Sequence, residues 1–317
     1  MTSRRSFLQL ALAAPAAFAN GHKKPMRGIF PIMQTPFSAD GAKVDNATLV
    51  KEALFLDKCG AHGMVWPQLA SEYFTLSTEE RIAGAESLLS VAREVRSAVV
   101  IGVQADTAKQ AVEYARHATN LGADALIALP PQTEKDAQKI FSYYKAIGES
   151  SSLPLFVQAI GDMSVDFIIQ MSREIPTLRY IKDEAGPVLN RMTEFRRRAP
   201  ELNSFTGNHG RTLYEEMLRG SAGSMPAAGF ADLYSISWDL FQQGRRRESS
   251  EFFARCLLLI SEAETYGVDS LKYILHLRGV FPNYASRKGA GKGGEFDAAA
   301  KQSISELLEH SRPHLRA

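Results

Sequence analysis

One lysine ends an apolar run typical of a β-strand, and this position could make it a nucleophile. In the run from Leu178 to Lys182, the two-residue alternation of a strand puts Tyr180 and Lys182 on the same face. If that face is buried, the neutral amine is favoured, and a neutral amine can attack a ketone to form a Schiff base. The iminium is an electron sink that permits cleavage or formation of a carbon–carbon bond, or loss of water, beside the carbonyl carbon. The simpler alternative is an ion pair of Lys182 with Asp183 or Glu184 at a strand end.

Eight short β-type runs alternate with longer segments of helical period, and this alternation predicts a parallel sheet with crossover helices. The runs are residues 28–33, 63–66, 98–103, 125–129, 155–158, 180–182, 204–206 and 223–225. The helical segments are 46–58, 78–95, 108–121, 135–149, 165–173, 188–198, 211–219 and 231–243. Eight such pairs predict an α/β fold of the (β/α)8 TIM-barrel type. An open doubly wound sheet fits less well, because no GxGxxG turn follows the first run and no phosphate-binding loop occurs.

In a barrel of this kind the active site lies at the carboxyl ends of the strands. Polar residues that end a run or follow it closely are therefore the candidate site residues. They are, in chain order, Thr35, Ser71, Glu72, Gln104, Gln132, Gln158, Lys182, Asp183, Glu184, Asn208, His209 and Arg211.

We expect three parts of the chain, an export signal with its linker, the barrel, and a C-terminal helical extension, at residues 1–25, 26–244 and 245–317. The extension is predicted to hold helices over 251–266, 270–278 and 298–312. These are too few for an independent core, so we expect them to pack on the barrel or on a partner subunit. The basic, glycine-rich segment 287–294 is expected to be a solvated loop.

The charge balance and the cysteine count exclude several classes of function. There are 37 Lys and Arg against 35 Asp and Glu, a formal charge of +2, which argues against nucleic acid as a partner. Cys59 and Cys256 form neither a disulfide framework nor a CxxC metal site, and we expect both to be buried thiols. His310 and His314 share HxxxH spacing only at the chain end. We therefore expect no metal and no cofactor.

The N-terminus has the features of an export signal. Arg4 and Arg5 are followed by a short, alanine-rich apolar stretch with an Ala-x-Ala end at Ala19. The string Ser-Arg-Arg-x-Phe-Leu resembles a twin-arginine signal, and the stretch is too short to span a bilayer comfortably. We expect cleavage after Ala19, no stable membrane insertion afterwards, and a periplasmic or otherwise exported protein. The alternatives are a retained membrane anchor and an ordinary amphipathic helix.

Several strings are similar to motifs of the dihydrodipicolinate synthase and N-acetylneuraminate lyase family. They are the opening segment 28–37, then 40–45, 63–72, 75–80, 122–125 and Ile181-Lys182-Asp183. The resemblance covers about residues 27–280. It implies a (β/α)8 Schiff-base lyase that acts on a 2-oxo acid, usually pyruvate, with Lys182 as the Schiff-base lysine. It also implies a homo-oligomer, either a dimer or a tetramer.

Three departures from the family's motifs bear on the site. The GTTGE string, which holds the carboxylate of the 2-oxo acid, reads 68–72 Gln-Leu-Ala-Ser-Glu here, although the N–H groups of Ala70 and Ser71 could still bind a carboxylate. Gln132 replaces the tyrosine that relays protons after strand four. The segment that begins at Gln158 lacks the arginine that holds a second carboxylate, which argues against true dihydrodipicolinate synthase activity. The implied substrate-binding residues are Ala70, Ser71, Glu72, Gln132, Gln158 and Asn208.

Another titratable group must then replace the missing tyrosine within reach of the carbon next to the imine. His209 is the first choice, because it lies in the loop after run 204–206 and histidine titrates near neutral pH. Glu184 and Glu72 come next. Alternatively, His209 bonds the backbone or caps the helix that begins at Arg211.

The leading hypothesis is a Schiff-base lyase, an aldolase or dehydratase, acting on a 2-oxo acid such as pyruvate or on a 2-keto-3-deoxy sugar acid. Its catalytic residues would be Lys182, His209 and Glu184. The competing hypothesis is an exported, non-catalytic protein that binds a 2-oxo acid or sugar acid on the same barrel. A metal-dependent barrel hydrolase would require His and carboxylate clusters at the strand ends, which the sequence lacks.

Overall fold

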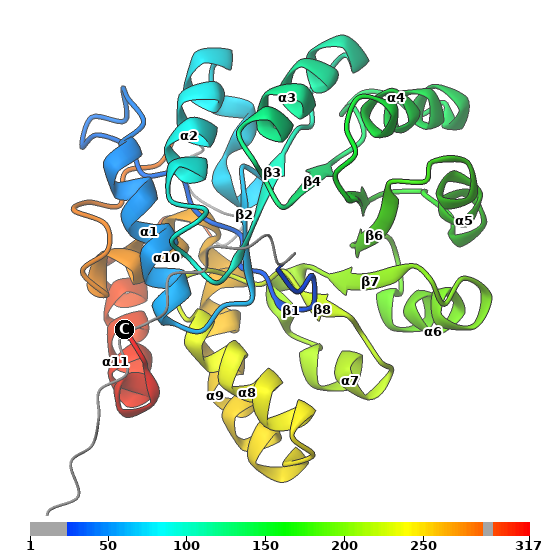
Figure 1. The fold of residues 1–317 in the computed structure, drawn as a ribbon. Helices are drawn as coiled ribbons and strands as arrows, with labels where there is room; N and C mark the ends of the chain where they lie inside the picture. The colour runs from blue at the N-terminus through cyan, green and yellow to red at the C-terminus, as the bar shows by residue number, and fades with distance from the viewer. Residues whose placement is uncertain (1–23, 288–293) are drawn as a thin grey trace, which may run out of the picture.

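Eight parallel strands form a barrel in the computed structural model, which describes residues 24–287 and 294–317 (Figure 1). The strands are β1 (Gly28–Ile29), β2 (Gly63–Trp66), β3 (Ala98–Gly102), β4 (Ala125–Ala128), β5 (Leu155–Ala159), β6 (Leu178–Asp183), β7 (Asn203–Thr206) and β8 (Gly223–Ser224). Their order is β1-β8-β7-β6-β5-β4-β3-β2. Ile32 closes the ring, because it forms parallel bridges to both Val65 and Ala227. The predicted TIM barrel is confirmed.

The eight barrel helices fall where the helical periodicity predicts them. They are α1 (Asn46–Lys58), α2 (Thr78–Ser90), α3 (Ala108–Asn120), α4 (Ala137–Glu149), α5 (Val165–Glu174), α6 (Val188–Arg198), α7 (Leu213–Leu218) and α8 (Ala231–Gln242). Polar caps fix several of the starts. At α2, Ser77 and Glu80 form a capping box, in which each side chain accepts from the other residue's N–H.

The side chains of β6 alternate as the sequence predicts. Tyr180 points into the barrel, where its ring stacks on Phe156 at 4.5 Å and meets the edge of Phe205. Asp183 points outward and binds Arg191 of α6 at 2.8 Å. Lys182, two residues beyond Tyr180, therefore faces the interior at the carboxyl end of the barrel and is 4% exposed.

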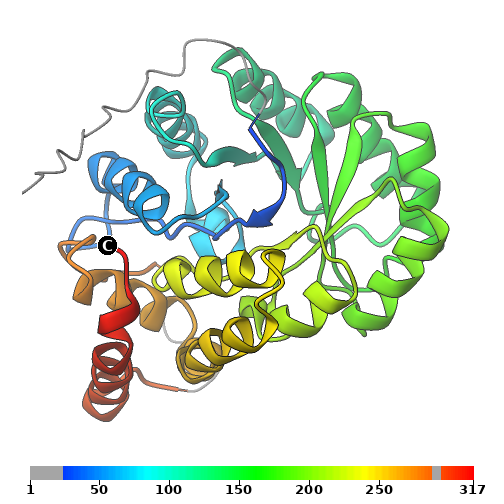
Figure 2. The same ribbon diagram turned by 60° about the horizontal axis from the view of Figure 1, so that its bottom comes forward.

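The C-terminal helices pack on one side of the barrel. They are α9 (Arg246–Tyr266), α10 (Val268–Leu277) and α11 (Ala298–Ser311), and α9 lies beside α8 (Figure 2). Residues of all three share an apolar cluster with Trp238 of α8, for example Cys256, Leu271 and Ile304. Gly267 separates α9 from α10 with a φ of 61° and a ψ of −135°, a conformation that suits glycine. This turn brings the start of α10 to the mouth of the barrel.

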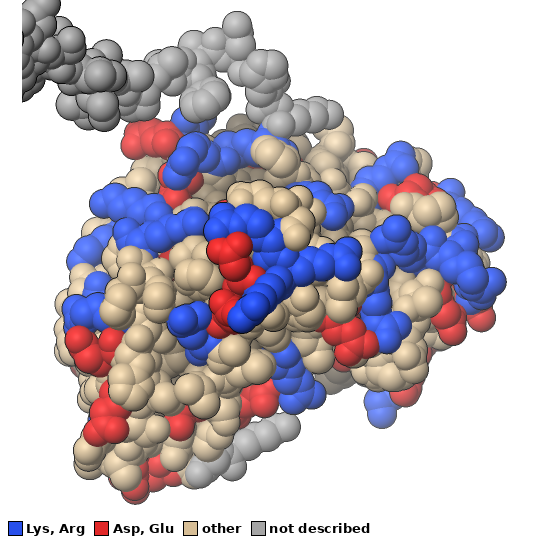
Figure 3. Space-filling view, turned by 90° about the horizontal axis from the view of Figure 1, so that it is seen from below, with Lys and Arg blue, Asp and Glu red and all other residues tan. Residues whose placement is uncertain are grey.

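The charge distribution on the surface and the burial of the two cysteines are those expected from the composition. Basic and acidic side chains are interspersed on the face in Figure 3. Cys59 and Cys256 are free and buried, as expected, and burial raises the pKa of both thiols. Within residues 24–287 and 294–317, no helix has the length and apolarity needed to cross a membrane. The predicted export signal lies almost entirely outside the described residues.

Candidate active site

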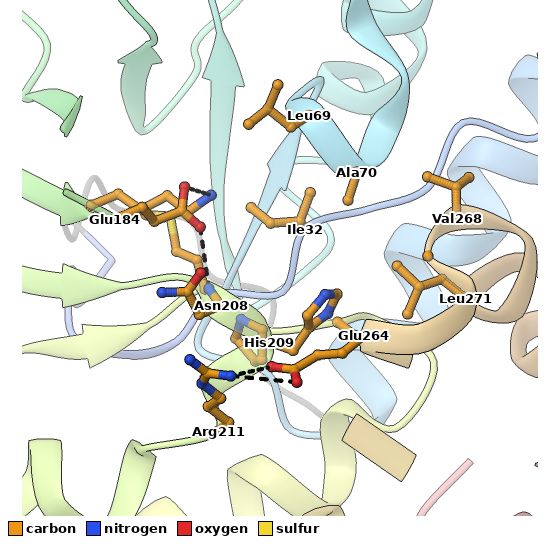
Figure 4. A pocket seen from close by; sticks show the side chains of 15 residues that line it. Ile32, Leu69, Ala70, Glu184, Asn208, His209, Arg211, Glu264, Val268 and Leu271 are labelled. Atoms are coloured by element: carbon orange, nitrogen blue, oxygen red, sulfur yellow. Dashed lines mark hydrogen bonds and ion pairs between the residues drawn. The ribbon is translucent and has the colours of Figure 1, made fainter. Parts of the chain in front are cut away.

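A cavity of about 450 Å³ opens at the carboxyl ends of the strands (Figure 4). Side chains from the barrel loops and from the α9–α10 junction enclose it. Its lining comprises Ile32, Leu69, Ala70, Lys182, Glu184, Asn208, His209, Arg211, Met225, Pro226, Ala227, Glu264, Gly267, Val268 and Leu271. Six residues proposed from the sequence are thus brought together: Ala70, Lys182, Glu184, Asn208, His209 and Arg211.

Lys182 and Glu184 form an ion pair in this cavity, in which the lysine is buried and the glutamate is partly buried. The Nζ atom of Lys182 lies 3.2 Å from Oε2 of Glu184. The same oxygen accepts from Nε2 of Gln158 at 2.5 Å, and Oε1 accepts from the Asn208 N–H at 3.2 Å. Burial by itself would raise the pKa of Glu184, but the charge of Lys182 and these hydrogen bonds outweigh it and hold the pKa below its ordinary value. Glu184 is therefore a carboxylate at neutral pH.

Glycine at position 207 permits this arrangement. A β-carbon on Gly207 would lie 1.8 Å from Oε1 of Glu184 and 2.8 Å from Cε of Lys182. The ion pair proposed as the simpler interpretation of Lys182 exists with Glu184, whereas Asp183 faces the other way. Gln158 acts on the site through Glu184, since its side chain is not part of the cavity lining.

His209 lies on a turn with unusual backbone angles. Asn208 and His209 have φ values of 49° and 53°, in the left-handed region that few residues other than glycine and asparagine adopt readily. The Tyr234 hydroxyl donates to the His209 carbonyl and supports the turn. Burial lowers the pKa of His209, while the carboxylates of Glu264 and Glu184 act in the opposite direction. His209 lines the cavity and does not cap α7, because the N-cap residue of α7 is Thr212.

A buried carboxyl group joins the two ends of this loop. The hydroxyls of Thr206, at the end of β7, and Thr212, before α7, donate to the two oxygens of Glu216 at 2.5 and 2.7 Å. Burial raises the pKa of Glu216 to about 7. Sequence analysis missed this residue. The i,i+4 spacing of Thr212 and Glu216 was visible, but the contact with Thr206 depends on the fold.

The loop expected to hold the substrate carboxylate is a single 3₁₀ turn, Leu69–Ser71. Leu69 and Ala70 line the cavity, whereas Ser71 is bonded into the scaffold. The Ser71 hydroxyl donates to the Met33 carbonyl at 2.5 Å, and the Ser71 N–H donates to the Gln68 carbonyl at 2.9 Å. Ala70 is in the first turn, where N–H groups have no partner within the helix. Of the two residues whose N–H groups were proposed from the sequence, Ala70 is the one that lines the cavity.

Glu72 lies behind this turn and connects it to the C-terminal extension. It has a φ of 56°, and its Oε2 is 2.5 Å from Nζ of Lys272, a residue of α10. Both side chains are fully buried. Lys272 also donates to the Ala285 carbonyl at 2.8 Å, and its ammonium lies 4.1 Å from the centre of the Phe37 ring. Glu72 is not part of the cavity lining.

Arg287 is fixed in place, although the sequence placed it in a solvated loop. Its N–H donates to Oε1 of Glu72 at 2.7 Å. Its guanidinium pairs with Glu80 at 2.7 Å and donates to the Gly41 and Ala42 carbonyls. For Arg287 the expectation is wrong, because these acceptors come from segments more than 200 positions away. The following residues, 288–293, lie outside the described part of the chain.

Gln132 does not line the cavity. Its Nε2 donates to the Tyr73 hydroxyl at 2.9 Å, and burial raises the pKa of Tyr73. Tyr143 and Tyr144 lie in α4, where Tyr143 accepts from the Ala105 N–H and Tyr144 donates to the Ala128 carbonyl.

Among the described residues, no group of three or more His, Cys, Asp or Glu side chains is arranged to hold a metal ion.

Comparisons with known proteins agree with this geometry. The model of the Dihydrodipicolinate synthetase family matches residues 25–310. A 4-hydroxy-tetrahydrodipicolinate synthase from Rhizobium meliloti (strain 1021) is 32% identical over 168 residues, which are 51% of this chain and only 56% of that protein. The L-2-keto-3-deoxyarabonate dehydratase of Azospirillum brasilense is 27% identical over 274 residues, 82% of this chain and 87% of the enzyme. A putative dihydrodipicolinate synthetase from Pseudomonas aeruginosa shares the fold, with a TM-score of 0.82 at 23% identity over 90% of this chain and 99% of that one. The chain belongs to the dihydrodipicolinate synthetase family.

Proposed function

We propose that the protein is a Schiff-base lyase, an aldolase or dehydratase, that acts on a 2-oxo acid such as pyruvate or on a 2-keto-3-deoxy sugar acid. The observation that carries this proposal is the position of the buried Lys182 amine. It lines the cavity, and its Nζ lies 3.2 Å from the carboxylate of Glu184. Membership of the family supports a lyase. The likeness to a 2-keto-3-deoxyarabonate dehydratase, over 82% of this chain, supports a keto-deoxy acid among the possible substrates.

The reaction would begin with attack of the neutral Lys182 amine on the ketone carbon C2. Loss of the carbonyl oxygen as water leaves an iminium on Nζ. In aldol cleavage, a base takes the proton of the C4 hydroxyl, the C3–C4 bond breaks, and its electron pair neutralises the iminium as an enamine. In dehydration, a base removes the C3 proton, and the enamine then expels the C4 hydroxyl as water with the help of an acid. After aldol cleavage, an acid returns a proton to C3 of the enamine and so restores an iminium. Hydrolysis of the final iminium in either route returns the amine and the product.

The residues around Lys182 have distinct parts in this proposal. Glu184 accepts the proton that the lysine must lose and returns it to the carbinolamine oxygen as that oxygen leaves as water. Ionised again, Glu184 then stabilises the iminium charge. Neutral His209 acts as the base on the substrate, the role of the tyrosine that Gln132 replaces. The Ala70 N–H binds the substrate carboxylate, and Asn208, whose N–H bonds Glu184, contacts the substrate beside its reacting carbons. Ser71, Glu72 and Gln158 hold these groups in position.

A specific observation also favours a second function, binding without turnover. Gln132 has no titratable group, and Leu69 and Ala70 carry no hydroxyl for the substrate carboxylate. The test is product analysis by mass spectrometry after incubation with 2-keto-3-deoxy sugar acids. Pyruvate plus an aldehyde indicates an aldolase, and loss of one water indicates a dehydratase. Saturable binding with neither product would replace the lyase by the binding protein.

We further propose export of the mature protein to the periplasm and assembly as a homo-oligomer. Arg4, Arg5 and the Ala-x-Ala end at Ala19 support export. Fractionation of cells that produce the full chain tests it, with Arg4→Lys/Arg5→Lys as the variant. The processed protein should be in the periplasmic fraction, and the unprocessed variant should stay inside. Light scattering of the processed protein tests the oligomer, since a monomeric mass would contradict it.

A further inference from the structure

The two walls of the cavity differ in chemistry. In Figure 4, Glu184, Asn208 and Arg211 lie on one side. Leu69 and Leu271 lie on the other, together with Ile32 and Val268. This apolar wall combines the opening segment of the barrel, the 3₁₀ turn after β2 and the first turn of α10. It presents no side-chain hydrogen-bond donor or acceptor.

The charged groups of the polar wall already have partners. Glu184 accepts from Lys182, from Gln158 and from the Asn208 N–H. The guanidinium of Arg211 binds both carboxylate oxygens of Glu264, at 3.2 and 3.4 Å. Apart from Lys182, Arg211 is the one Lys or Arg among the described residues that line the cavity. A second carboxylate on the substrate would therefore have to compete with Glu264 for its cation.

Leu69 is the most exposed residue of the apolar wall. It is 37% exposed at the cavity mouth, whereas Ile32, Val268 and Leu271 are each no more than 5% exposed. Family members with the GTTGE string carry a threonine hydroxyl at this position. An exposed leucine here offers a bound molecule apolar surface that water would otherwise contact.

The cavity is larger than a three-carbon acid requires. With the 2-oxo acid end placed between Lys182 and the Ala70 N–H, the rest of the substrate extends along this wall. A polyhydroxylated chain would leave hydroxyls without partners there, which weakens binding. An alkyl or aryl group would instead displace water from the exposed Leu69 side chain and pack against the rest of the wall. We infer that the substrate is a 2-oxo acid with an apolar, uncharged group beyond C3, selected by Leu69, Val268 and Leu271. This inference rests on the proposed Schiff-base function and narrows its substrate class.

Borohydride trapping compares substrates before any choice between aldolase and dehydratase. The processed protein is incubated with borohydride and increasing 2-oxo-4-phenylbutanoate, 2-keto-3-deoxygluconate or pyruvate, and the reduced adduct is followed by intact mass. Half-labelling should need about tenfold less of the phenyl acid than of the sugar acid. Equal labelling, or preference for the sugar acid, would overturn the inference. Labelling by pyruvate without the preference leaves the Schiff-base function standing, whereas no labelling by any of the three acids contradicts that function itself.

Three variants test the wall. Leu69→Thr and the nearly isosteric Val268→Thr should each reduce the preference for the phenyl acid several-fold, expressed as the ratio between the two acids in the same variant. The matched control is Leu121→Thr, because Leu121 is 41% exposed but lies outside the cavity, after α3. Its ratio should equal that of the parent protein. If Leu69→Thr and Val268→Thr melt like the parent and keep its ratio, the wall does not select the substrate.

Discussion

Lys182 and Glu184 lie two residues apart on and just beyond β6, and their Nζ and Oε2 atoms are 3.2 Å apart in the cavity. The period of a strand puts both side chains on the inner face. Glu184 is thereby the nearest acceptor for the proton that the lysine must lose. Because its pKa is lowered, Glu184 is ionised before the transfer and can accept that proton.

Replacement of Glu184 by Gln should slow Schiff-base formation by a factor of about 10² to 10⁴, the usual contribution of a positioned acid or base. The amide keeps the shape and the hydrogen-bonding oxygen but cannot take the proton. The rate of borohydride-trapped adduct formation at fixed pyruvate measures this. Glu194→Gln, on the exposed face of α6, is the control. A rate within twofold of the parent would remove Glu184 from the proton transfer.

His209→Asn should lower kcat by a similar factor of about 10² to 10⁴ and change the pH profile. Asparagine tolerates the left-handed backbone of this position, so the turn should survive. Because burial lowers the pKa of His209 below 6.5, the parent enzyme should keep its activity at pH 6.5 and lose it only at lower pH. The acidic limb should be absent from the variant. His310→Asn, on α11, should change neither kcat nor the pH profile. An unchanged acidic limb in His209→Asn would exclude His209 as the base.

Glu216 should make the protein less stable as the pH rises from about 4.5 to 7. Its pKa is raised to about 7 in the folded chain, against 4.5 for an ordinary glutamate, so the unfolded chain loses this proton first. The contribution of Glu216 to the free energy of unfolding is fully present below pH 4.5. It decreases by roughly 3 kcal/mol as the pH rises from 4.5 to above 7. In Glu216→Gln this decline should disappear.

Urea unfolding at pH 5 and pH 8 measures the effect. The free energy of unfolding of Glu216→Gln, relative to the parent, should increase between the two values. Glu215→Gln, at the adjacent exposed position, corrects for the general effect of pH. Parallel pH dependences of Glu216→Gln and the parent would show that Glu216 titrates at the same pH in both states.

Lys272→Met should reduce the free energy of unfolding by about 3–5 kcal/mol, because it removes the buried ammonium that lies 2.5 Å from the buried Glu72 carboxylate. The double variant Glu72→Gln/Lys272→Met should lose much less than the two single variants together. Lys145→Met removes an exposed i,i+4 pair with Glu149 and should change stability by no more than about 0.5 kcal/mol. Additive losses in the double variant would mean that Glu72 and Lys272 do not stabilise each other.

The sequence predicts those parts of the site that depend on local periodicity. Alternation along β6 placed Lys182 inside the barrel, and the position of His209 after β7 placed it at the same end. The contacts of Glu264, Lys272 and Arg287 could not be predicted in this way. Their partners Arg211 and Glu72 lie between 53 and 215 positions away, so helix packing decides which of them meet.

The sequence also cannot predict which backbone N–H groups are bonded within the turn 69–71. Residue types alone do not distinguish Ala70, which lines the cavity, from Ser71, whose N–H donates to the Gln68 carbonyl. The single 3₁₀ turn makes the difference, because the N–H groups of its first residues have no partner within the turn, whereas that of its last residue is used internally.

The Schiff base itself is tested most directly by intact-mass analysis of the processed protein after treatment with pyruvate and borohydride. The account predicts one reduced pyruvate per chain, located on Lys182 by peptide mapping and absent from Lys182→Ala. Lys301→Ala, a change on α11 away from the cavity, should label like the parent. No adduct with pyruvate or any other 2-oxo acid, while one of them still raises the melting temperature, would contradict the lyase. An adduct that persists in Lys182→Ala would contradict the assignment of the lysine.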